Sequence, residues 1–284
     1  MQWHQVMAAI YLARPADARQ LIETARPQAE RVGHHNVVWF YQLLGASLAL
    51  ADGSLDDAAA QAKQALALGE EYRIPWNFSS ELMLGQIAFY RGETDLAISH
   101  YRRAIVMEPP SYWSGLSRSA LFAALAQEGR PDALAVLPEV PLRLPVLNRA
   151  NAFGTWVSLT HIIEGLAWAG RFDDAAALHP AAEALIATGV KCFRDMRLYR
   201  TAAAIAAACA GEWALADAHF DAALDQAEVA PLRIADAHAR LWRGKLLCRR
   251  GPHSTEPSRL LLEQAIASFD SLRMPTFAAG AREP

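Results

Sequence analysis

The chain has 284 residues, of which 53% are hydrophobic and 20% charged, and its net charge is −3. This balance excludes wholesale disorder and leaves no basic stripe for nucleic acid or for an anionic membrane. Cys192, Cys209 and Cys248 are too far apart for a metal knuckle and odd in number, which is typical of a reducing compartment. The chain shows neither a signal-peptide pattern nor a membrane-length apolar stretch, so we expect a cytoplasmic protein.

A ladder of small and aromatic residues recurs along the chain. Its first clear copy is Gly85, Gly92, Ala97, Tyr101 and Ala104, with successive steps of 7, 5, 4 and 3 residues. The same steps recur in two later copies, Ile163–Gly170–Ala175–His179–Ala182 and Ala204–Gly211–Ala216–Phe220–Ala223. Looser copies surround Ala18, Gly53, Gly129 and Gly251. A fixed step pattern of this kind indicates a repeat architecture.

Each step of the ladder has a physical reason. The first small residue, such as Gly85, lets the first helix of a pair approach its partner closely. The second, such as Gly92, ends that helix in a turn that favours positive φ. Acids such as Asp56 and Asp57 follow the turn, where they suit the amino terminus of the second helix. The ladder therefore predicts antiparallel helix pairs.

These residues resemble the tetratricopeptide repeat over nearly the whole chain. The resemblance implies an all-α fold, a right-handed superhelix of antiparallel helix pairs (an α-solenoid), with about six pairs and a partial helix. An α-solenoid of another period is the alternative.

Prolines interrupt the array once, at Pro138, Pro141 and Pro145. Their density forbids a helix. We therefore expect N-terminal helix pairs over 1–137, a proline-rich crossover over 138–149 and C-terminal helix pairs over 150–284, which together form one continuous superhelix.

Six stretches of the C-terminal part suggest a narrower relationship. They are residues 152–156, 164–167, 188–195 (TGVKCFRD), 204–213 (AIAAACAGEW), 218–228 and 272–275. They resemble the C-terminal tetratricopeptide arm of bacterial class III adenylate/guanylate cyclases and of LuxR-type STAND ATPase regulators. The resemblance implies a sensor arm that works with a cyclase or ATPase domain in cis or in trans. Because the chain has no GxxxxGK[ST] loop, we expect the arm alone.

The predicted function is a non-catalytic scaffold that binds a protein or peptide in its concave groove, without a cofactor, a metal or direct contact with nucleic acid or membrane. His161 and Glu164 share one helix face, but without a third ligand we interpret them as polar lining. The candidate groove residues are Gln42, Gln86, Phe89, Thr160, Glu164, Trp168, Leu241 and Lys245.

Two alternatives remain open. The first is a small-molecule sensor in which Trp156, Trp168 and Trp242 form the walls of the site. The second is an α/α-toroid enzyme, which requires carboxylates that converge in a central cavity.

Overall fold

The computed structural model describes residues 3–109, 115–136, 144–251 and 255–282. Within these ranges the chain forms sixteen α-helices and one isolated bridge, between Cys192 and Leu198. The first helices of the successive pairs are α1 (Trp3–Tyr11), α3 (His35–Ala51), α5 (Phe78–Tyr90), α7 (Leu116–Gln127), α9 (Phe153–Trp168), α12 (Tyr199–Cys209), α14 (Arg233–Arg250) and the unpaired α16 (Pro275–Arg282). The second helices are α2 (Pro15–Arg31), α4 (Leu55–Glu71), α6 (Thr94–Met107), α8 (Ala133–Val136), the short α10 (Phe172–Ala177) and α11 (His179–Ala187), α13 (Trp213–Val229) and α15 (Thr255–Ser271).

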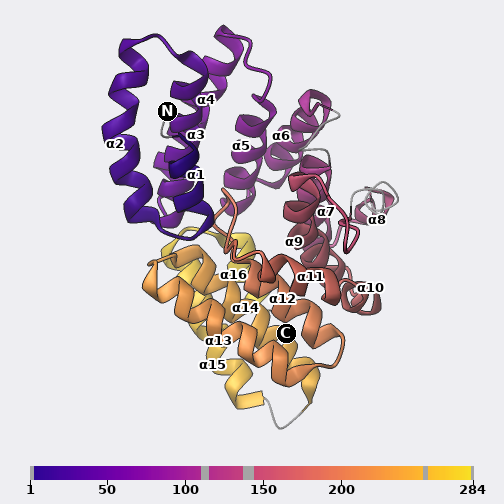
Figure 1. Ribbon diagram of the computed structural model, residues 1–284. Helices are drawn as coiled ribbons and strands as arrows, with labels where there is room; N and C mark the ends of the chain where they lie inside the picture. Colours follow the sequence, from indigo (N-terminus) through magenta and orange to yellow (C-terminus); the bar gives the residue numbers. More distant parts are fainter. Residues whose placement is uncertain (1–2, 110–114, 137–143, 252–254, 283–284) are drawn as a thin grey trace.

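The two helices of a pair are joined by only a few residues and pack side by side, as Figure 1 shows. The predicted all-α array of antiparallel helix pairs is confirmed. The described residues contain seven pairs and a final helix, one pair more than expected, because α1 forms and completes the first pair with α2.

The two helices of a pair differ in burial. In the first helix α5, every residue except Leu82 is buried. In the second helix α13, the buried set is Ala216, His219, Phe220, Ala223 and Ala227. The first helices therefore form an inner layer and the second helices an outer one with a narrow apolar stripe.

The glycines between the two helices of a pair have the predicted left-handed backbone. Five of them have φ values from 62° at Gly129 to 81° at Gly211, with Gly53, Gly92 and Gly170 between these two, and Gly251, which follows α14, has a φ of 132°. Acidic residues occupy the first turn of α4, α6 and α10, where they face the unpaired amides of the helix start.

The first and fourth positions of the ladder contact each other. An added Cβ at Gly85 would lie 2.7 Å from the ring of Tyr101, and one at Gly244 would lie 2.7 Å from Leu262. The small residue on the first helix thus makes room for the large residue on the second. The two are 16 positions apart in the pair of Gly85 and Tyr101 and 18 apart in the pair of Gly244 and Leu262.

We expect Gly85→Ala to lower the free energy of unfolding by about 1–3 kcal/mol, because the new methyl group must displace the buried Tyr101 ring. Urea denaturation measures the loss. The control is Gly45→Ala in α3, where the methyl would meet only the end of the Gln61 side chain, so the better helix propensity of alanine is expected to leave stability unchanged or raised by up to about 1 kcal/mol. Equal losses in both variants would contradict the packing explanation.

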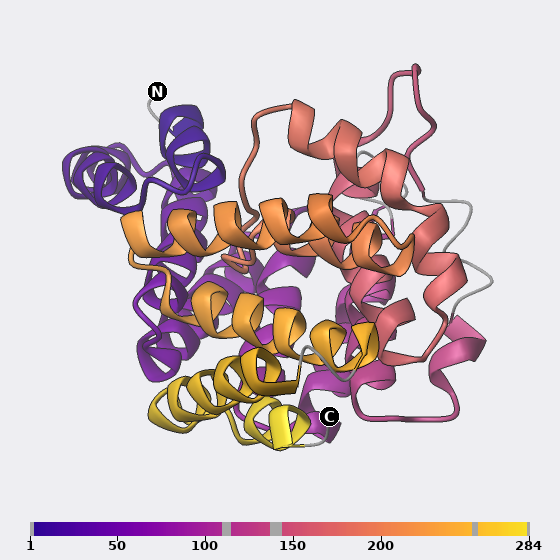
Figure 2. The same cartoon turned by 90° about the horizontal axis from the view of Figure 1, so that it is seen from below.

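The C-terminal pairs close against the N-terminal ones. Helix α14 packs beside α3, and α16 packs beside α5; Figures 1 and 2 show the later helices lying across the earlier part of the array. Phe277 of α16 lies 5.4 Å from Phe89 and 5.5 Å from Tyr90, measured between ring centres. The side chains of the first helices therefore face one another inside the molecule.

The parts before and after the proline-rich crossover share one hydrophobic core, which extends from Val6 to Ala281. Pro138 and Pro141 of the crossover lie outside the described residues. The helix that follows the crossover is α9, and it spans 16 residues. Among the described residues, no helix combines the length and the apolar character needed to cross a membrane.

Candidate functional site: a buried ionic cluster

A short loop between α11 and α12 folds back on itself in the interior, where Cys192 and Leu198 form an antiparallel bridge around a turn at Arg194 and Asp195. We call residues 190–198 the crossing segment. Its two ends are held together, because Tyr199 N donates to Lys191 O at 2.8 Å, and Lys191 N donates to Tyr11 O at 2.8 Å. The Cys192 thiol donates to Ile10 O at 3.0 Å. The segment thus ties the end of α1 to the start of α12.

The crossing segment carries charged side chains into the core. Arg197 donates to Glu164 Oε2 at 2.7 Å and to Asp195 Oδ2 at 2.8 Å. His161 Nε2 lies 3.6 Å from Asp195, and His238 Nε2 lies 3.5 Å from Glu164. These five residues, which we call the ionic cluster, are all at most 9% exposed. They come from α9, the crossing segment and α14.

Burial and Arg197 together set the protonation of the cluster. Burial raises the pKa of Glu164 to about 7, against the opposing effect of Arg197. Burial also lowers the pKa of His161 and of His238 to about 3, and Arg197 adds to both shifts. Burial opposes the ionisation of Asp195, yet Arg197 and His161 hold its pKa below the ordinary value. At neutral pH the cluster therefore holds a charged Arg197, a charged Asp195 and two neutral histidines.

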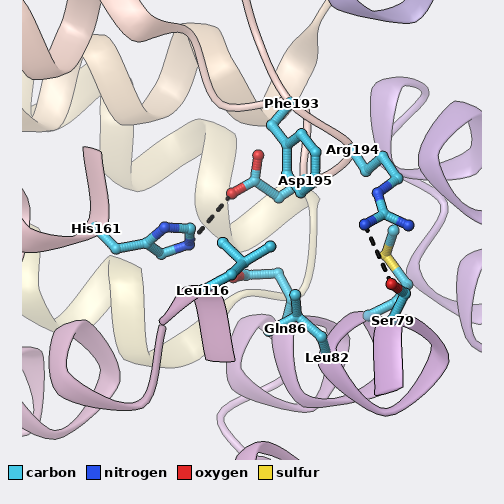
Figure 3. A pocket seen from close by; sticks show the side chains of 9 residues that line it. Ser79, Leu82, Gln86, Leu116, His161, Phe193, Arg194 and Asp195 are labelled. Carbon is cyan, nitrogen blue, oxygen red and sulfur yellow. Dashed lines mark hydrogen bonds and ion pairs between the residues drawn. The ribbon is translucent and has the colours of Figure 1, made fainter. Parts of the chain in front are cut away.

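A second arginine of the crossing segment lies near the cluster. Arg194 donates to Ser79 Oγ of α5 at 3.3 Å. Figure 3 shows Arg194 beside Ser79 on one side of a small cavity and His161 on the other, with Asp195 between them and directed toward His161. The crossing segment is thus bonded to α1, α5 and α9 at once.

The space beside the cluster is small. The cavity of Figure 3 has a volume of about 20 Å³, and a second one, between Gln86, Glu164 and Arg197, has about 10 Å³. Either volume is near that of a single water, whereas small-molecule sites measure about 300–1,000 Å³. Arg197 Nη2 and Tyr90 Oη have no hydrogen-bond partner among the described residues, so a water in this space would have polar groups to bind.

The arrangement of the buried carboxylates bears on two alternatives, an α/α-toroid enzyme and a metal site. Two carboxylates, Glu164 and Asp195, do converge at the centre of the array, as a toroid enzyme requires. They bind the same guanidinium, however, and the adjoining cavities do not admit an organic substrate. Within the described ranges, no group of three His, Cys, Asp or Glu side chains is placed to hold a metal ion. His161 and Glu164 bind Asp195 and Arg197, respectively.

The structure places the predicted groove residues inside the molecule. Six of them are at most 5% exposed, and Trp168 and Lys245 are partly buried; the six are Gln42, Gln86, Phe89, Thr160, Glu164 and Leu241. The inner face on which they lie is covered by the chain's own α14, α16 and crossing segment. In this conformation a partner cannot reach these six side chains.

The groove residues bind other parts of the chain. Gln42 Nε2 donates to Gln64 Oε1 of α4, and Tyr101 donates to Gln86 Oε1 at 3.4 Å. Lys245 Nζ donates to Gly280 O of α16 at 3.1 Å and lies 5.0 Å from the centre of the Trp168 ring. Their polar groups therefore stabilise the closed array.

The proposed tryptophan walls also lack an enclosed space between them. The rings of Trp168 and Trp242 are 4.8 Å apart, and Trp242 is 2% exposed. Trp156 is partly buried and packs against a second apolar cluster of the core. The contact between Trp168 and Trp242 leaves no room for a ligand between the two rings.

The repeat pattern did not point to Arg194, Asp195 and Arg197, which connect the helices at the centre of the array. These residues lie outside the ladder, between two helices, where the pattern predicts no contacts. The one usable signal was the density of charge in Arg194-Asp-Met-Arg197, next to the apolar α12.

No known protein family matches the sequence, and no curated protein matches it either. Among solved structures, the chain is similar to a tetratricopeptide repeat protein from Parabacteroides merdae, with 11% sequence identity, a TM-score of 0.44 and 99% of each chain covered.

Proposed function

We propose that this chain is a non-catalytic helical-repeat scaffold that binds a protein partner on its outer surface, as the regulatory arm of a bacterial signalling protein. The observation that carries the proposal is the combination of a repeat array over the whole described chain with an interior that its own helices fill. A scaffold of this kind offers a large surface and little internal space.

The filled interior favours the outer layer as the binding surface. The cavities at the ionic cluster are of water size. Larger hollows lie on the outer helices, with volumes of about 320 Å³ against α2, α3 and α4 and about 660 Å³ against α6 and Arg130. The partner is therefore expected on the second helices of the pairs rather than in the concave groove.

The signalling role rests on the resemblance of residues 152–156, 188–195 and 204–213 to the arms of cyclases and STAND ATPases. Residues 188–195 include most of the charged part of the crossing segment, so the resemblance falls on residues that hold the array closed. The partner proposed for the chain is accordingly a cyclase or ATPase domain, in cis or in trans.

Cross-linking in an extract of the source organism tests this function. We expect the full chain, carrying photo-reactive residues on α4, α6, α13 and α15, to form a discrete adduct with one protein that contains a cyclase or STAND ATPase domain. Tryptophan fluorescence is expected to stay constant when a metabolite library is added. A fluorescence change with one metabolite and no protein adduct at any position would overturn the proposal.

A further inference from the structure

The hollow against α2, α3 and α4 lies in a part of the chain that the structure describes without a gap. We call it the α2–α4 hollow. Its volume of about 320 Å³ is at the lower end of the range for small-molecule sites. A face of α3 with the small residues Gly45 and Ala49 forms its floor, and α2 and α4, labelled in Figure 1, form its walls. The hollow therefore has room for one long side chain of a partner.

The arginines of the α2–α4 hollow already have acidic partners. Arg19 donates to Asp52 Oδ1 at 2.5 Å, and Arg26 donates to Glu30 Oε1 at 2.7 Å. Among the described residues that border the hollow, no other side chain is basic. The positive charge of the hollow is thus balanced within the chain.

Two acids of the hollow have no basic partner. Glu23 borders it from α2 and Asp57 from α4, and both side chains are exposed. Within the described ranges neither forms an ion pair, and Asp57 accepts a hydrogen bond from the neutral Ser54 Oγ at 2.6 Å. The two walls of the hollow therefore carry negative charge that the chain does not balance.

A further polar group borders the hollow from its floor. Tyr41 is 2% exposed and lines the hollow, and its hydroxyl has no hydrogen-bond partner among the described residues. Burial raises the pKa of this hydroxyl, so it is neutral and can accept a hydrogen bond from a cation. Because buried polar groups are nearly always paired, the donor for this hydroxyl must come from the hollow, from water or from a ligand.

Apolar side chains lie between these polar groups. Ile22 of α2 and Leu48 of α3 border the hollow together with Ala49. An arginine side chain matches such a surface, because its apolar stem can cover aliphatic groups while its planar fork of N–H donors binds several oxygens at once. Lysine places all its donors on one nitrogen and reaches fewer separated acceptors.

We propose that the α2–α4 hollow binds an arginine side chain of the protein partner. The stem of this arginine covers Ile22 and Leu48, and its guanidinium donates to Glu23, Asp57 and the Tyr41 hydroxyl. The inference rests on the proposed function, since it assigns a place on the outer layer to that partner.

Two amino-acid amides of the same shape test the chemistry. The probe is N-acetyl-arginine amide, and its control is N-acetyl-citrulline amide, in which an uncharged ureido group replaces the guanidinium. By ligand-observed NMR, the full chain is expected to bind the arginine probe with a millimolar Kd and the citrulline control at least tenfold more weakly. Raising the salt from about 50 to about 300 mM is expected to weaken binding of the arginine probe several-fold.

Variants then locate the site. Glu23→Gln/Asp57→Asn is expected to weaken binding of the arginine probe at least tenfold, with an unchanged circular dichroism spectrum. The matched control Asp225→Asn/Glu228→Gln removes two exposed acids of α13 and is expected to bind as the unmodified chain does. Tyr41→Phe is expected to weaken binding several-fold without lowering the Tm, because the hydroxyl has no partner in the chain to lose. Equal binding of both probes, or equal weakening by both double variants, would overturn the proposal.

Cross-linking separates this inference from the proposed function. Ala60 is exposed on α4 beside the hollow, and Val229 is 86% exposed on α13. A photo-reactive residue at Ala60 is expected to give an adduct with the cyclase or ATPase partner that Glu23→Gln/Asp57→Asn abolishes, and one at Val229 is expected to give none. Adducts from other positions alone would refute the α2–α4 hollow and leave the scaffold function standing, whereas no protein adduct anywhere would refute both. Micromolar binding of the arginine probe without an adduct at Ala60 would identify a free small cation as the ligand and overturn the proposed partner.

Discussion

Replacement of Arg197 by methionine is expected to lower the free energy of unfolding by about 3–5 kcal/mol. The change leaves Glu164 and Asp195 buried without the guanidinium that binds both at 2.7 and 2.8 Å. Methionine fills much of the same volume, so the loss reports mainly the uncompensated acids. Because Glu164 can escape by taking up a proton, we expect the loss to be larger at pH 8 than at pH 6. Urea denaturation at the two pH values measures it.

The control for this variant is Arg240→Met on α14. Arg240 binds Asp236 one turn away at 2.8 Å and is partly exposed, so its loss is expected to cost less than about 1 kcal/mol. Replacing Glu164 and Asp195 by their amides in the Arg197→Met background is expected to recover part of the stability. A loss as small as that of Arg240→Met, or one independent of pH, would show that the cluster does not hold the array together.

The stability of the protein is expected to fall as the pH drops below 6.5, and to fall more steeply below 4.5. His161 and His238 have an ordinary pKa of 6.5 that burial lowers to about 3 in the folded chain. Between these values the unfolded chain binds more protons, so each histidine contributes a loss of about 1.4 kcal/mol per pH unit of acidification. Urea denaturation between pH 4.0 and 7.5 measures the slope.

Glu164 acts in the opposite direction over part of this range. Its pKa is raised from 4.5 to about 7 in the folded chain, so between these values the folded state binds more protons and acidification stabilises it. This contribution cancels that of one histidine. The cluster therefore gives the free energy of unfolding a net slope of about 1.4 kcal/mol per pH unit between pH 4.5 and 6.5, and of about 2.8 kcal/mol per pH unit below pH 4.5.

Single variants separate the three groups. His161→Gln and His238→Gln are each expected to flatten the slope by about 1.4 kcal/mol per pH unit, and Glu164→Gln to steepen it by the same amount between pH 4.5 and 6.5. The exposed His35, which stacks on Tyr72 at 3.6 Å, is the control, and His35→Gln is expected to leave the slope unchanged. The assignment fails if His35→Gln and His161→Gln alter the slope equally.

The helix pairs could be predicted from the sequence because their determinants are local. Gly92 and Gly211 lie in turns that need a left-handed backbone. Gly85 lies against the ring of Tyr101, which is only sixteen positions later in the chain. Such residues interact within one pair, so their spacing records the fold of each repeat.

The candidate sites could be predicted only in part. Helical periodicity indicates which residues of a helix face inward, and Glu164 is 3% exposed in the structure. Whether that face is open or covered depends on contacts that no spacing records: Cys192 binds Ile10 across 182 residues, and Arg194 binds Ser79 across 115.

The sequence by itself therefore determined that this protein is an all-α array of helix pairs. Only the tertiary structure decided that the array closes on itself, that its concave face is filled by α14, α16 and the crossing segment, and that Arg197 sits between two buried acids. The physical reason is the range of the interactions. Turn geometry and helix periodicity act over a few residues, whereas burial of charge and closure of the interior depend on segments that only the complete fold brings together.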